Sequence, residues 1–542
     1  MGPMNAQVVD TCNALNQSGV HMPGYCITTM RANTVVTPSW IHFGGGNIFM
    51  AYLAALQQAL LDKGLTTSGI IVAESFDPEI VTQMYRTNDL LFLQVVTHKT
   101  GDLETRLIAS VADAVIADPT QEHEWNRLMD YFASPDVQMV SLTITEKGYN
   151  LRSLEGHFLP VVQHDIETGP NSPRNVISQV TALAYHRFKN GAAPIAFVSM
   201  DNCSENGRRL QEAVFAIAEQ WNDRGDVTED FISYLNDPKK VAFPWTMIDR
   251  ITPRPAEKVR EHLIRLGLKE TDIIRTAKGT YLGRCFANTE PTSYLFIEDW
   301  FPNGRPLLDK VGVVYTNRET IREIERMKVG TCLNPLHTAL AMFGCLLGYK
   351  YIHQEMQDPA LKALVVKIGY DEGMPVVVNP KVIDPRVFLR TVIEERFPNP
   401  FILDEPWRIA TDTSQKMLPR YGETIKAYVA NAKDSSQLTY IPLVIAAWLR
   451  LLTGVNDEGQ AMDLQRLSPD PMMNELQMHL QGIEFGKPET VGNSLRPILS
   501  NARIFGVDLY SVGLGEKIEG YFAEMIQGYG AVRRPLEKYV YE

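Results

Sequence analysis

Three consecutive glycines, Gly44 to Gly46, constrain the fold of this chain more than any other short stretch of it. A short apolar run at residues 40–43 precedes them, and apolar residues with helical spacing follow from Ile48 to about Lys63. A strand that turns through glycines into a helix is the unit of parallel sheets covered by helices. It also predicts a site for a phosphate-containing ligand, because glycines allow close approach and the helix N-terminus offers unpaired N–H groups.

The rest of the first half continues this alternation of strand-like and helix-like segments. Strands are expected at residues 69–73, 90–97, 137–145 and 194–200, and amphipathic helices at 175–188 and 205–221. Alternation of this kind predicts an α/β fold, a parallel sheet with helices on both faces.

The pattern changes after about residue 316. Helices are expected at residues 318–328, 335–351, 384–395, 421–431 and 438–452, whereas strand candidates are rare and lie mainly at 363–368 and 375–378. We therefore predict two domains. Residues 1–316 form a Rossmann-like dinucleotide-binding domain, and residues 317–542 form a mostly helical substrate domain.

The end of the second expected strand carries the carboxylates that a dinucleotide site requires. Glu74 stands where such folds hold the ribose hydroxyls, and Asp77 is the alternative. A carboxylate there repels a 2′-phosphate, so NAD is predicted in preference to NADP. Phe49 replaces the third glycine of the usual GxGxxG pattern, and an ordinary glycine turn is the competing interpretation.

Composition excludes several classes of function. Among the 542 residues, 52 Lys and Arg face 64 Asp and Glu, which gives a net charge of −12 and disfavours binding to nucleic acid or anionic membrane. The first residues lack the basic and apolar stretches of a secretory signal, and the apolar run at 441–452 is too short to cross a bilayer. Scattered cysteines without a CxxC pair, and histidines without HExxH, predict a cytoplasmic protein with no metal site.

Four segments are polar where a core is normally apolar. They are residues 199–207, residues 243–253 with the adjacent Asp249 and Arg250, residues 325–337, and residues 408–416. In the third segment Glu325 and Lys328 share one helix face, and Asn334 and His337 have the same spacing. Each segment also has a structural interpretation, as helix caps, a buried polar network, a core histidine or a solvated loop.

Seven motifs, taken together and in order, resemble the polyol-specific long-chain dehydrogenases. This family includes mannitol 2-dehydrogenase, fructuronate (mannonate) reductase and tagaturonate reductase. The motifs are HFGGGNIF at 42–49, SLTITEKGYN at 141–150, DNCSENG at 201–207, FPWTMIDRITP at 243–253, FIEDWFPNGRP at 296–306, NPLHTALA at 334–341, and RFPNP with RIATDTSQK within 396–416. The resemblance runs from about Ile41 to about Lys426.

The resemblance implies metal-independent hydride transfer between NAD and C2 of a ketose or polyol. It implies that Lys328 is the general acid–base, and that Asn202 and Asn334 donate hydrogen bonds to the reacting oxygen. The other implied roles are a hydroxyl contact for His337, a proton gate for Glu325, network support for Asp249, and binding of the far end of the sugar for Arg408 and Lys416. Implied cofactor contacts are Phe43, Gly44, Gly45, Gly46, Asn47, Ile48, Glu74, Thr143 and Thr145.

The sequence departs from the family pattern at two places. Five residues separate Lys328 from Asn334 where the family usually has four, which indicates a one-residue insertion. Thr411 stands where mannitol-oxidising members tend to carry histidine. Thr411 disfavours mannitol as the substrate. The long connections, such as residues 235–241, and the RIATDTSQK run resemble the uronate reductases, so we predict the reduction of D-fructuronate to D-mannonate with NADH. Tagaturonate reductase and mannitol 2-dehydrogenase are alternatives within the family, and a nucleotide-binding protein without catalysis is the alternative from another class.

Overall fold

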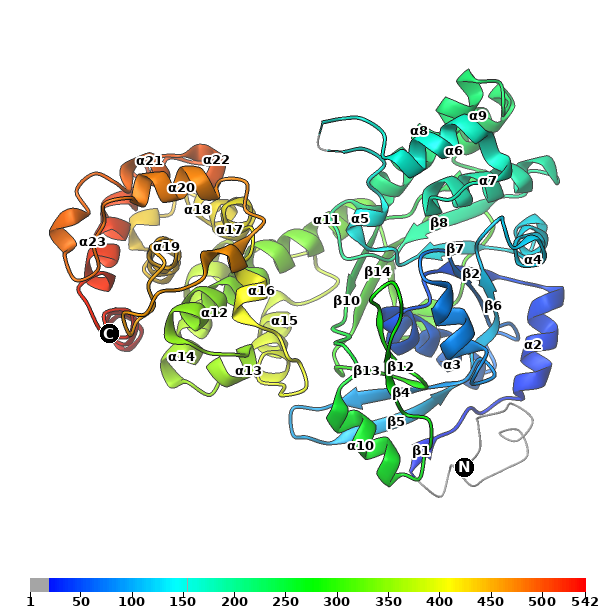
Figure 1. The fold of residues 1–542 in the computed structure, drawn as a ribbon, viewed down its shortest axis with the longest axis horizontal. Coiled ribbons are helices and arrows are strands. Elements are labelled where there is room, and N and C mark those ends of the chain that lie inside the picture. The colour runs from blue at the N-terminus through cyan, green and yellow to red at the C-terminus, as the bar shows by residue number, and fades with distance from the viewer. Residues whose placement is uncertain (1–18, 154) are drawn as a thin grey trace. The chain divides into compact units, whose positions relative to one another are not determined.

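The computed structural model describes residues 19–153 and 155–542, and the chain divides into two compact units, Met1–Ile321 and Arg322–Glu542 (Figure 1). A six-stranded sheet forms the centre of the first unit, in the order β6-β3-β2-β7-β8-β9. Its strands are Val111–Ile116, Ile70–Glu74, Trp40–Phe43, Met139–Leu142, Ile195–Ser199 and Val241–Ala242. All neighbouring strands are parallel, so the predicted α/β fold with a parallel sheet is confirmed.

Both faces of this sheet are buried. Along β2, Ile41 and Phe43 belong to one hydrophobic core, whereas Trp40 belongs to the other. Successive side chains of a strand point to opposite faces, so this division shows that apolar groups cover the sheet on both sides. The covering helices include η2 (Phe49–Leu53) continuing into α3 (Ala54–Asp62), α4 (Glu122–Ala133), α7 (Val176–Lys189) and α8 (Asn206–Asp223).

The position of β2 in the sheet places the glycine turn. β2 lies between β3 and β7. After β2 the chain adds β3 and β6 on one side of it, and later adds β7, β8 and β9 on the other side. Ligands of open parallel sheets bind at the carboxyl ends of the strands where the order reverses in this way. The turn that follows Phe43 lies at this point.

The strand expected at 90–97 forms, but it belongs to a second sheet. β4 (Phe92–Thr97) pairs antiparallel with β5 (Leu103–Ile108) in the order β1-β5-β4-β13, where β1 is Val20–His21 and β13 is Phe286–Thr289. The connection between β4 and β5 is too short for the crossover that a parallel pair requires. Smaller sheets join β10 (Thr246–Asp249), β14 (Tyr294–Glu298) and β15 (Val314–Thr316), and β11 (Ile273–Arg275) with β12 (Tyr281–Gly283).

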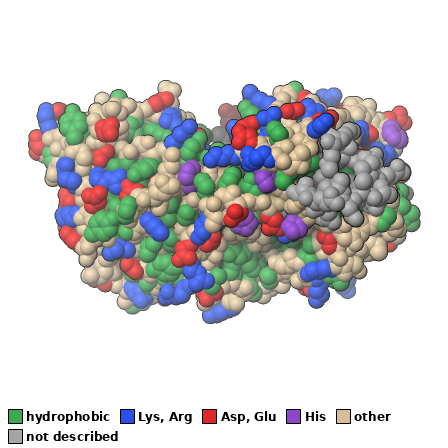
Figure 2. All heavy atoms as spheres, turned by 90° about the horizontal axis from the view of Figure 1, so that it is seen from below, with side chains coloured by type: hydrophobic (Ala, Val, Ile, Leu, Met, Phe, Trp, Pro, Cys, Tyr) green, Lys and Arg blue, Asp and Glu red, His purple; other side chains and the backbone are tan. Residues whose placement is uncertain are grey.

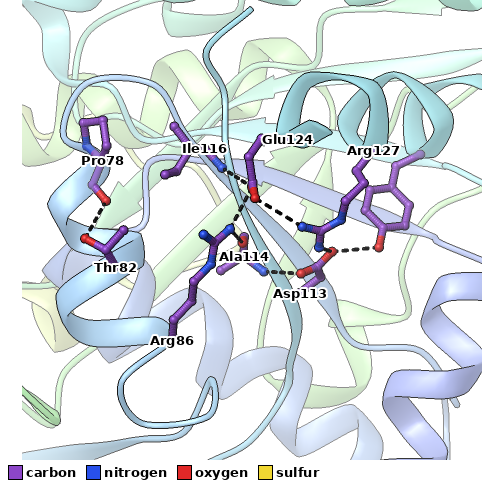
Figure 3. A network of polar contacts seen from close by, with 9 residues as sticks. Pro78, Thr82, Arg86, Asp113, Ala114, Ile116, Glu124 and Arg127 are labelled. Carbon is purple, nitrogen blue, oxygen red and sulfur yellow. Dashed lines mark hydrogen bonds and ion pairs between the residues drawn. The ribbon is translucent and has the colours of Figure 1, made fainter. Parts of the chain in front are cut away.

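A network of charged groups attaches α4 to the edge of the main sheet (Figure 3). Arg127 on α4 pairs with Asp113 on β6, and Tyr131 donates a hydrogen bond of 2.8 Å to the same carboxylate. Glu124 accepts a hydrogen bond of 2.7 Å from Arg86. Charge-assisted contacts in this half-buried setting orient the helix, and we assign them a structural role.

The second unit is helical. Its apolar centre is α12 (Asn334–Leu347) packed against α19 (Tyr440–Leu452), with α23 (Gly515–Met525) against α19. Other helices include α14 (Pro359–Lys367), α15 (Pro385–Thr391), α18 (Glu423–Ala430) and α24 (Arg533–Tyr541). By length and composition the helical run Arg318–Leu347 could cross a membrane, but 78% of its most apolar window is buried inside the structure, as is typical of a core helix.

The prediction of two strands in this half of the chain is wrong. Residues 363–368 form the end of α14 and the start of the π-helical turn Ile368–Gly373, and residues 375–378 overlap the 3-10 turn Met374–Val376. A short apolar run fits a buried helix as well as a buried strand. The start of α14 favours the helix, because Asp358 caps it by accepting a hydrogen bond of 2.9 Å from the N–H of Ala360.

Charged side chains of both signs are mixed on one face of the protein. Acidic and basic side chains are interspersed over the face drawn in Figure 2. This mixture holds although the sequence carries a net charge of −12.

A buried carboxylate anchors the start of α19. Glu372 accepts hydrogen bonds from the N–H groups of Thr439, Tyr440 (2.8 Å) and Ile441 (2.7 Å). Burial raises the pKa of Glu372 from 4.5 to about 7, against the lowering effect of these donors. Because the folded state holds this proton more tightly than the unfolded chain, Glu372 stabilises the fold below pH 4.5 and loses that contribution as the pH rises towards 7.

The Glu372→Gln variant is therefore expected to gain stability relative to the parent protein as the pH rises. Glutamine does not ionise, so the unfolding free energy of the variant minus that of the parent should increase between pH 4.5 and 7. The increase should be about 3 kcal/mol at most. Urea denaturation followed by circular dichroism measures the difference at each pH, with the exposed Glu475→Gln on α20 (Met473–Leu480) as control. A difference that does not change with pH would contradict the assignment.

Candidate active site

The three glycines after β2 serve different purposes. Gly44 has φ +103°, and a Cβ there would lie 2.2 Å from the carbonyl oxygen of Thr143. A Cβ on Gly45 would lie 2.8 Å from Cε2 of Tyr85. Gly46 differs, because a Cβ there would meet nothing within 4 Å. The protein itself requires the first two glycines, whereas the third leaves open space at the N-terminus of a helix.

A buried histidine joins the ends of β2 and β7. His42 Nδ1 lies 2.7 Å from Ser141 Oγ, and Nε2 lies 3.0 Å from Gly44 O and 2.9 Å from Thr143 Oγ1. Its ring stacks on Phe49 at 4.5 Å. Burial lowers the pKa of His42 to about 3, so the ring is neutral and acts as a hydrogen-bonding brace. The predicted cofactor residue Thr143 is held by this brace.

Glu74 also holds the glycine turn. Its side chain is 3% exposed and accepts hydrogen bonds from the N–H groups of Gly45 (2.8 Å), Phe76 (2.9 Å) and Asp77 (3.0 Å). Burial raises the pKa of Glu74, although these donors lower it. Asp77, the alternative ribose ligand, is buried and accepts a hydrogen bond of 2.6 Å from Thr276 Oγ1. Ribose binding by Glu74 stays a prediction, and the observed contacts make its carboxylate an anchor for Gly45.

Asn47 opens the helix and carries an unsatisfied acceptor. Its Nδ2 donates to the carbonyl oxygen of Tyr281 at 3.1 Å, and its buried Oδ1 has no hydrogen-bond partner in the described part of the chain. Phe43 is fully buried at the end of β2, and Ile48 is half-buried beside Asn47. The open space at Gly46, the free acceptor and the helix N-terminus fit a dinucleotide such as NAD.

A pair of glycine variants tests this fit. Gly46→Ala is expected to weaken NADH binding by about tenfold, because the methyl group occupies space next to the helix N-terminus where a pyrophosphate binds. Its thermal midpoint should stay that of the parent, since no atom lies within 4 Å. Gly44→Ala is the matched contrast and should lower the thermal midpoint. NADH fluorescence titration and thermal denaturation measure both effects, and undiminished affinity in Gly46→Ala would place the pyrophosphate elsewhere.

Asp201 connects two of the motifs. Its carboxylate accepts hydrogen bonds from the N–H groups of Ile144 and Thr145, both 2.9 Å, and from the hydroxyl of Tyr149 at 2.6 Å. Thr145 has φ +64°, a left-handed conformation that β-branched residues rarely adopt. Strain of this kind persists only where the surroundings hold it. Asp201 therefore holds the predicted cofactor residue Thr145 in this conformation at the start of α5 (Thr145–Gly148).

Asn206 connects the second of these motifs to the next. Its Nδ2 donates to Asp201 O at 3.0 Å and Thr246 Oγ1 at 2.8 Å, and its Oδ1 accepts from Thr246 N at 3.0 Å. The sequence indicated only a helix cap here, so this positioning residue was missed. Of the predicted catalytic residues in the first unit, Asn202 is exposed on the loop before α8, and Asp249 is buried at the end of β10.

A π-helical turn lies between Lys328 and the next motif, where the sequence predicts a one-residue insertion. This turn, η6 (Lys328–Cys332), continues α11 (Arg318–Met327), and Leu333 N–H donates to Lys328 O at 3.1 Å. A π turn holds one residue more than an α turn and is common at functional sites. Thr424 supports it with a hydrogen bond of 2.9 Å to Gly330 O. The side chain of Lys328 is 4% exposed, and Glu325 is half-buried on α11.

The N-terminal turn of α12 carries the next two predicted residues, Asn334 and His337. His337 Nε2 lies 2.9 Å from Asp404 Oδ2, and its ring stacks on Phe397 at 5.2 Å. Arg408 Nε donates to the other oxygen of Asp404 at 2.9 Å, while the Arg408 side chain remains 69% exposed. The structure thus brings His337 and Arg408 together through Asp404.

Asp404 was missed by the sequence interpretation. Its only signal is its position four residues before Arg408, which allows pairing on one helical turn. Burial would raise the pKa of Asp404, but the hydrogen bond and positive charge of His337 and the charge of Arg408 lower it. Burial lowers the pKa of His337, although Asp404 opposes this. A carboxylate therefore faces a largely neutral imidazole.

Lys416 and Arg420 lie on the following segment, α17 (Thr413–Met417) and the π turn η10 (Leu418–Gly422). Lys416 Nζ donates to the carbonyl oxygens of Ile409 (3.3 Å) and Thr411. Arg420 donates to Thr338 Oγ1 on α12. Burial, assisted by the charge of Arg420, lowers the pKa of Lys416 to about 8. Across residues 19–153 and 155–542, no three His, Cys, Asp or Glu side chains are grouped to hold a metal ion.

The fold and these residues define a dehydrogenase with a Rossmann domain and a helical second domain. Residues 38–310 match the mannitol dehydrogenase Rossmann domain, and residues 320–519 match the mannitol dehydrogenase C-terminal domain. The chain belongs to the mannitol dehydrogenase family. The predicted resemblance, the NAD-dependent oxidoreductase class and the NAD cofactor are confirmed at the level of this family.

Individual relatives match most or all of the chain. A D-mannonate oxidoreductase of Thermotoga maritima is 49% identical over 540 residues, covering 99% of each chain. A mannitol 2-dehydrogenase of Emericella nidulans is 29% identical and covers 89% of each chain. The solved mannitol 2-dehydrogenase of Pseudomonas fluorescens, a ternary complex with NAD and D-mannitol, is 27% identical with a TM-score of 0.69 over 100% of both chains.

Proposed function

We propose that this protein reduces the C2 ketone of D-fructuronate to D-mannonate with NADH, and catalyses the reverse oxidation. The choice of a sugar acid over a neutral polyol is supported by the 49% identity to a D-mannonate oxidoreductase over 99% of both chains. It is further supported by Thr411, which stands where mannitol-oxidising members tend to carry histidine. The substrate is a small sugar acid, and we keep the cytoplasmic location and the absence of nucleic-acid or membrane binding as predictions.

Lys328 is the proposed general acid. When bound, NADH supplies the hydride that C2 of the ketone accepts. The ammonium of Lys328 donates a proton to the oxygen at C2, so the carbonyl becomes a secondary alcohol and the lysine is left neutral. In the oxidation the neutral amine takes the hydroxyl proton back. The burial of Lys328 at 4% exposure excludes water from this proton transfer.

Asn334 and Asn202 are proposed to donate amide hydrogen bonds to the same oxygen. Such donors stabilise a developing alkoxide by about 3 kcal/mol each. Asn334 is fixed at the start of α12, where Thr338 donates a hydrogen bond of 2.9 Å to its carbonyl oxygen. Asp249 is proposed to support this arrangement, and Glu325 to exchange the Lys328 proton with solvent.

His337 is proposed to hold a neighbouring hydroxyl of the sugar. A neutral imidazole whose Nε2 donates to Asp404 presents Nδ1 as an acceptor. That acceptor fits a sugar hydroxyl, which donates. Arg408 is held by Asp404 on one side, so its exposed side chain keeps further donors for the substrate.

A substrate panel tests the function. NADH oxidation is measured with D-fructuronate, D-tagaturonate, D-fructose and their phosphates, and we expect kcat/KM for D-fructuronate to exceed that for D-fructose by about 100-fold. Preference for D-tagaturonate or D-fructose would assign the corresponding alternative activity. Absence of turnover with every substrate, while NADH still binds, would indicate a non-catalytic nucleotide-binding protein.

A further inference from the structure

We propose that Arg420, together with Lys416, binds the carboxylate of the substrate and so selects a sugar acid over a neutral ketose. This inference rests on the proposed function and names the group that recognises the acid. Arg420 was not among the residues that the sequence indicated. The two cations lie four residues apart on one helical segment, so their side chains occupy the same face.

Arg420 points to the helix that carries the proposed catalytic groups. Its Nη1 donates to Thr338 Oγ1, on the residue next to His337 in the first turns of α12. Thr338 also donates to Asn334 O at 2.9 Å, so one hydroxyl joins Arg420 to the turn that holds Asn334. The guanidinium is therefore held against the turn of α12 that carries Asn334 and His337, at the distance of one threonine hydroxyl.

Neither cation is neutralised within the described part of the chain. Lys416 donates only to two backbone carbonyls, and Arg420 only to a neutral hydroxyl, so neither forms an ion pair with a described acidic side chain. Of the nearby acids, Asp470 is engaged by the N–H and hydroxyl of Ser414. Two adjacent half-buried cations without a paired anion are costly, and a bound carboxylate removes that cost.

Arg408 is less suited to this task than Arg420. The Asp404 carboxylate already pairs with Arg408 and draws it towards His337. A guanidinium binds a carboxylate best through two parallel N–H donors, and Arg420 keeps such donors because only Nη1 is engaged.

The protonation of Lys416 supports the same conclusion. Burial and the charges of Arg420 and Arg408 lower the pKa of Lys416 to about 8, while Asp412 and Asp470 raise it. Burial lowers the pKa of Arg420 to about 10, opposed by Tyr421 and Asp412. A bound carboxylate favours the charged lysine, so affinity for an anionic sugar is full below pH 8 and declines above it.

Variants at Arg420 separate recognition of the acid from catalysis. Arg420→Met is expected to lower kcat/KM for D-fructuronate by about 30-fold and that for D-fructose by less than about threefold. Arg420→Lys keeps the charge without the paired donors and should lose about fivefold with D-fructuronate. Arg503→Met, at an exposed arginine on α22 (Ala502–Phe505), is the matched control and should change neither value. Equal losses with both ketoses in Arg420→Met would overturn the proposal.

Direct binding distinguishes this proposal from the proposed function. Calorimetric titration of D-mannonate into the NAD complex should show binding to the parent protein and none to Arg420→Met at the same concentrations. If the parent reduces no uronate but this contrast holds, the proposed function fails and the carboxylate site stands. If the parent binds D-mannonate and Arg420→Met binds it equally well, or if the parent does not bind it, the carboxylate site is refuted. As the pH is raised beyond 8, the dissociation constant of the parent protein for D-mannonate should increase. The Lys416→Arg variant should show no such increase. An increase that persists in Lys416→Arg would refute the role of Lys416.

Discussion

Lys328→Ala is expected to slow hydride transfer to D-fructuronate by about 1000-fold or more while NADH binding is unchanged. General acid catalysis by a positioned side chain accounts for factors of this size, and alanine leaves no group to protonate the oxygen at C2. The residues predicted to bind the nucleotide lie in the first unit, around Gly46 and Asn47, and Lys328 is not among them. Single-turnover stopped-flow absorbance measures the chemical step, and fluorescence titration measures NADH affinity.

Two comparisons make the Lys328 result specific. Lys362→Ala removes an exposed lysine from α14 and should leave the single-turnover rate unchanged. Added methylamine should restore part of the rate in Lys328→Ala, since a small amine can enter the space of the lost side chain and supply the proton. Near-normal hydride transfer in Lys328→Ala without added amine would remove Lys328 from the mechanism.

Asp404→Asn is expected to lower kcat/KM for D-fructuronate by about 100-fold, the usual upper range for a residue that orients a functional histidine. Asp404 accepts from His337 Nε2 and fixes the tautomer with Nδ1 as acceptor. An asparagine amide can instead donate to Nε2, which moves the proton to Nδ1 and turns the sugar contact into a clash of two donors. Steady-state kinetics with D-fructuronate measures this loss.

The pH profile separates orientation from general destabilisation. Asp404 opposes the burial that lowers the pKa of His337, so its removal should lower that pKa further. Because the neutral ring is the active form, the acidic limb of kcat/KM should move to lower pH in Asp404→Asn. Asp371→Asn, at an exposed aspartate in the turn after α14, is the control and should leave the limb in place. A loss of thermal stability without any movement of the limb would make Asp404 structural only.

Much of this protein can be predicted from local patterns. The strand, glycine turn and helix at residues 40–63 are specified by residues adjacent in the chain, and so are the apolar helices α12 and α19. The order of seven short motifs indicated the family, because each motif is contiguous. The extra residue before Asn334 stays a prediction from the family pattern, whereas the π-helical turn at Lys328–Cys332 is seen only in the structure.

The partners of the polar groups could not be predicted in the same way. Glu74 is predicted as a ribose ligand from its position at the end of β3, yet in the fold its carboxylate accepts hydrogen bonds from three backbone N–H groups. Asp404 has no motif of its own and gains its role only when folding brings α12 against the segment before Arg408. A sequence pattern reports periodicity and spacing, whereas hydrogen bonds between distant segments depend on packing.

The sequence by itself therefore determined the fold class and the glycine turn, because local spacing encodes both. The residues proposed for proton transfer came from the resemblance of its motifs to the family. Only the tertiary structure decided which cations remain available for an anionic substrate. Arg408 and Lys416 look equivalent in the sequence, but Asp404 pairs with Arg408, while Lys416 and Arg420 have no described acidic partner. The physical reason is that a buried charge is defined by the groups folded around it, and those groups come from several parts of the chain.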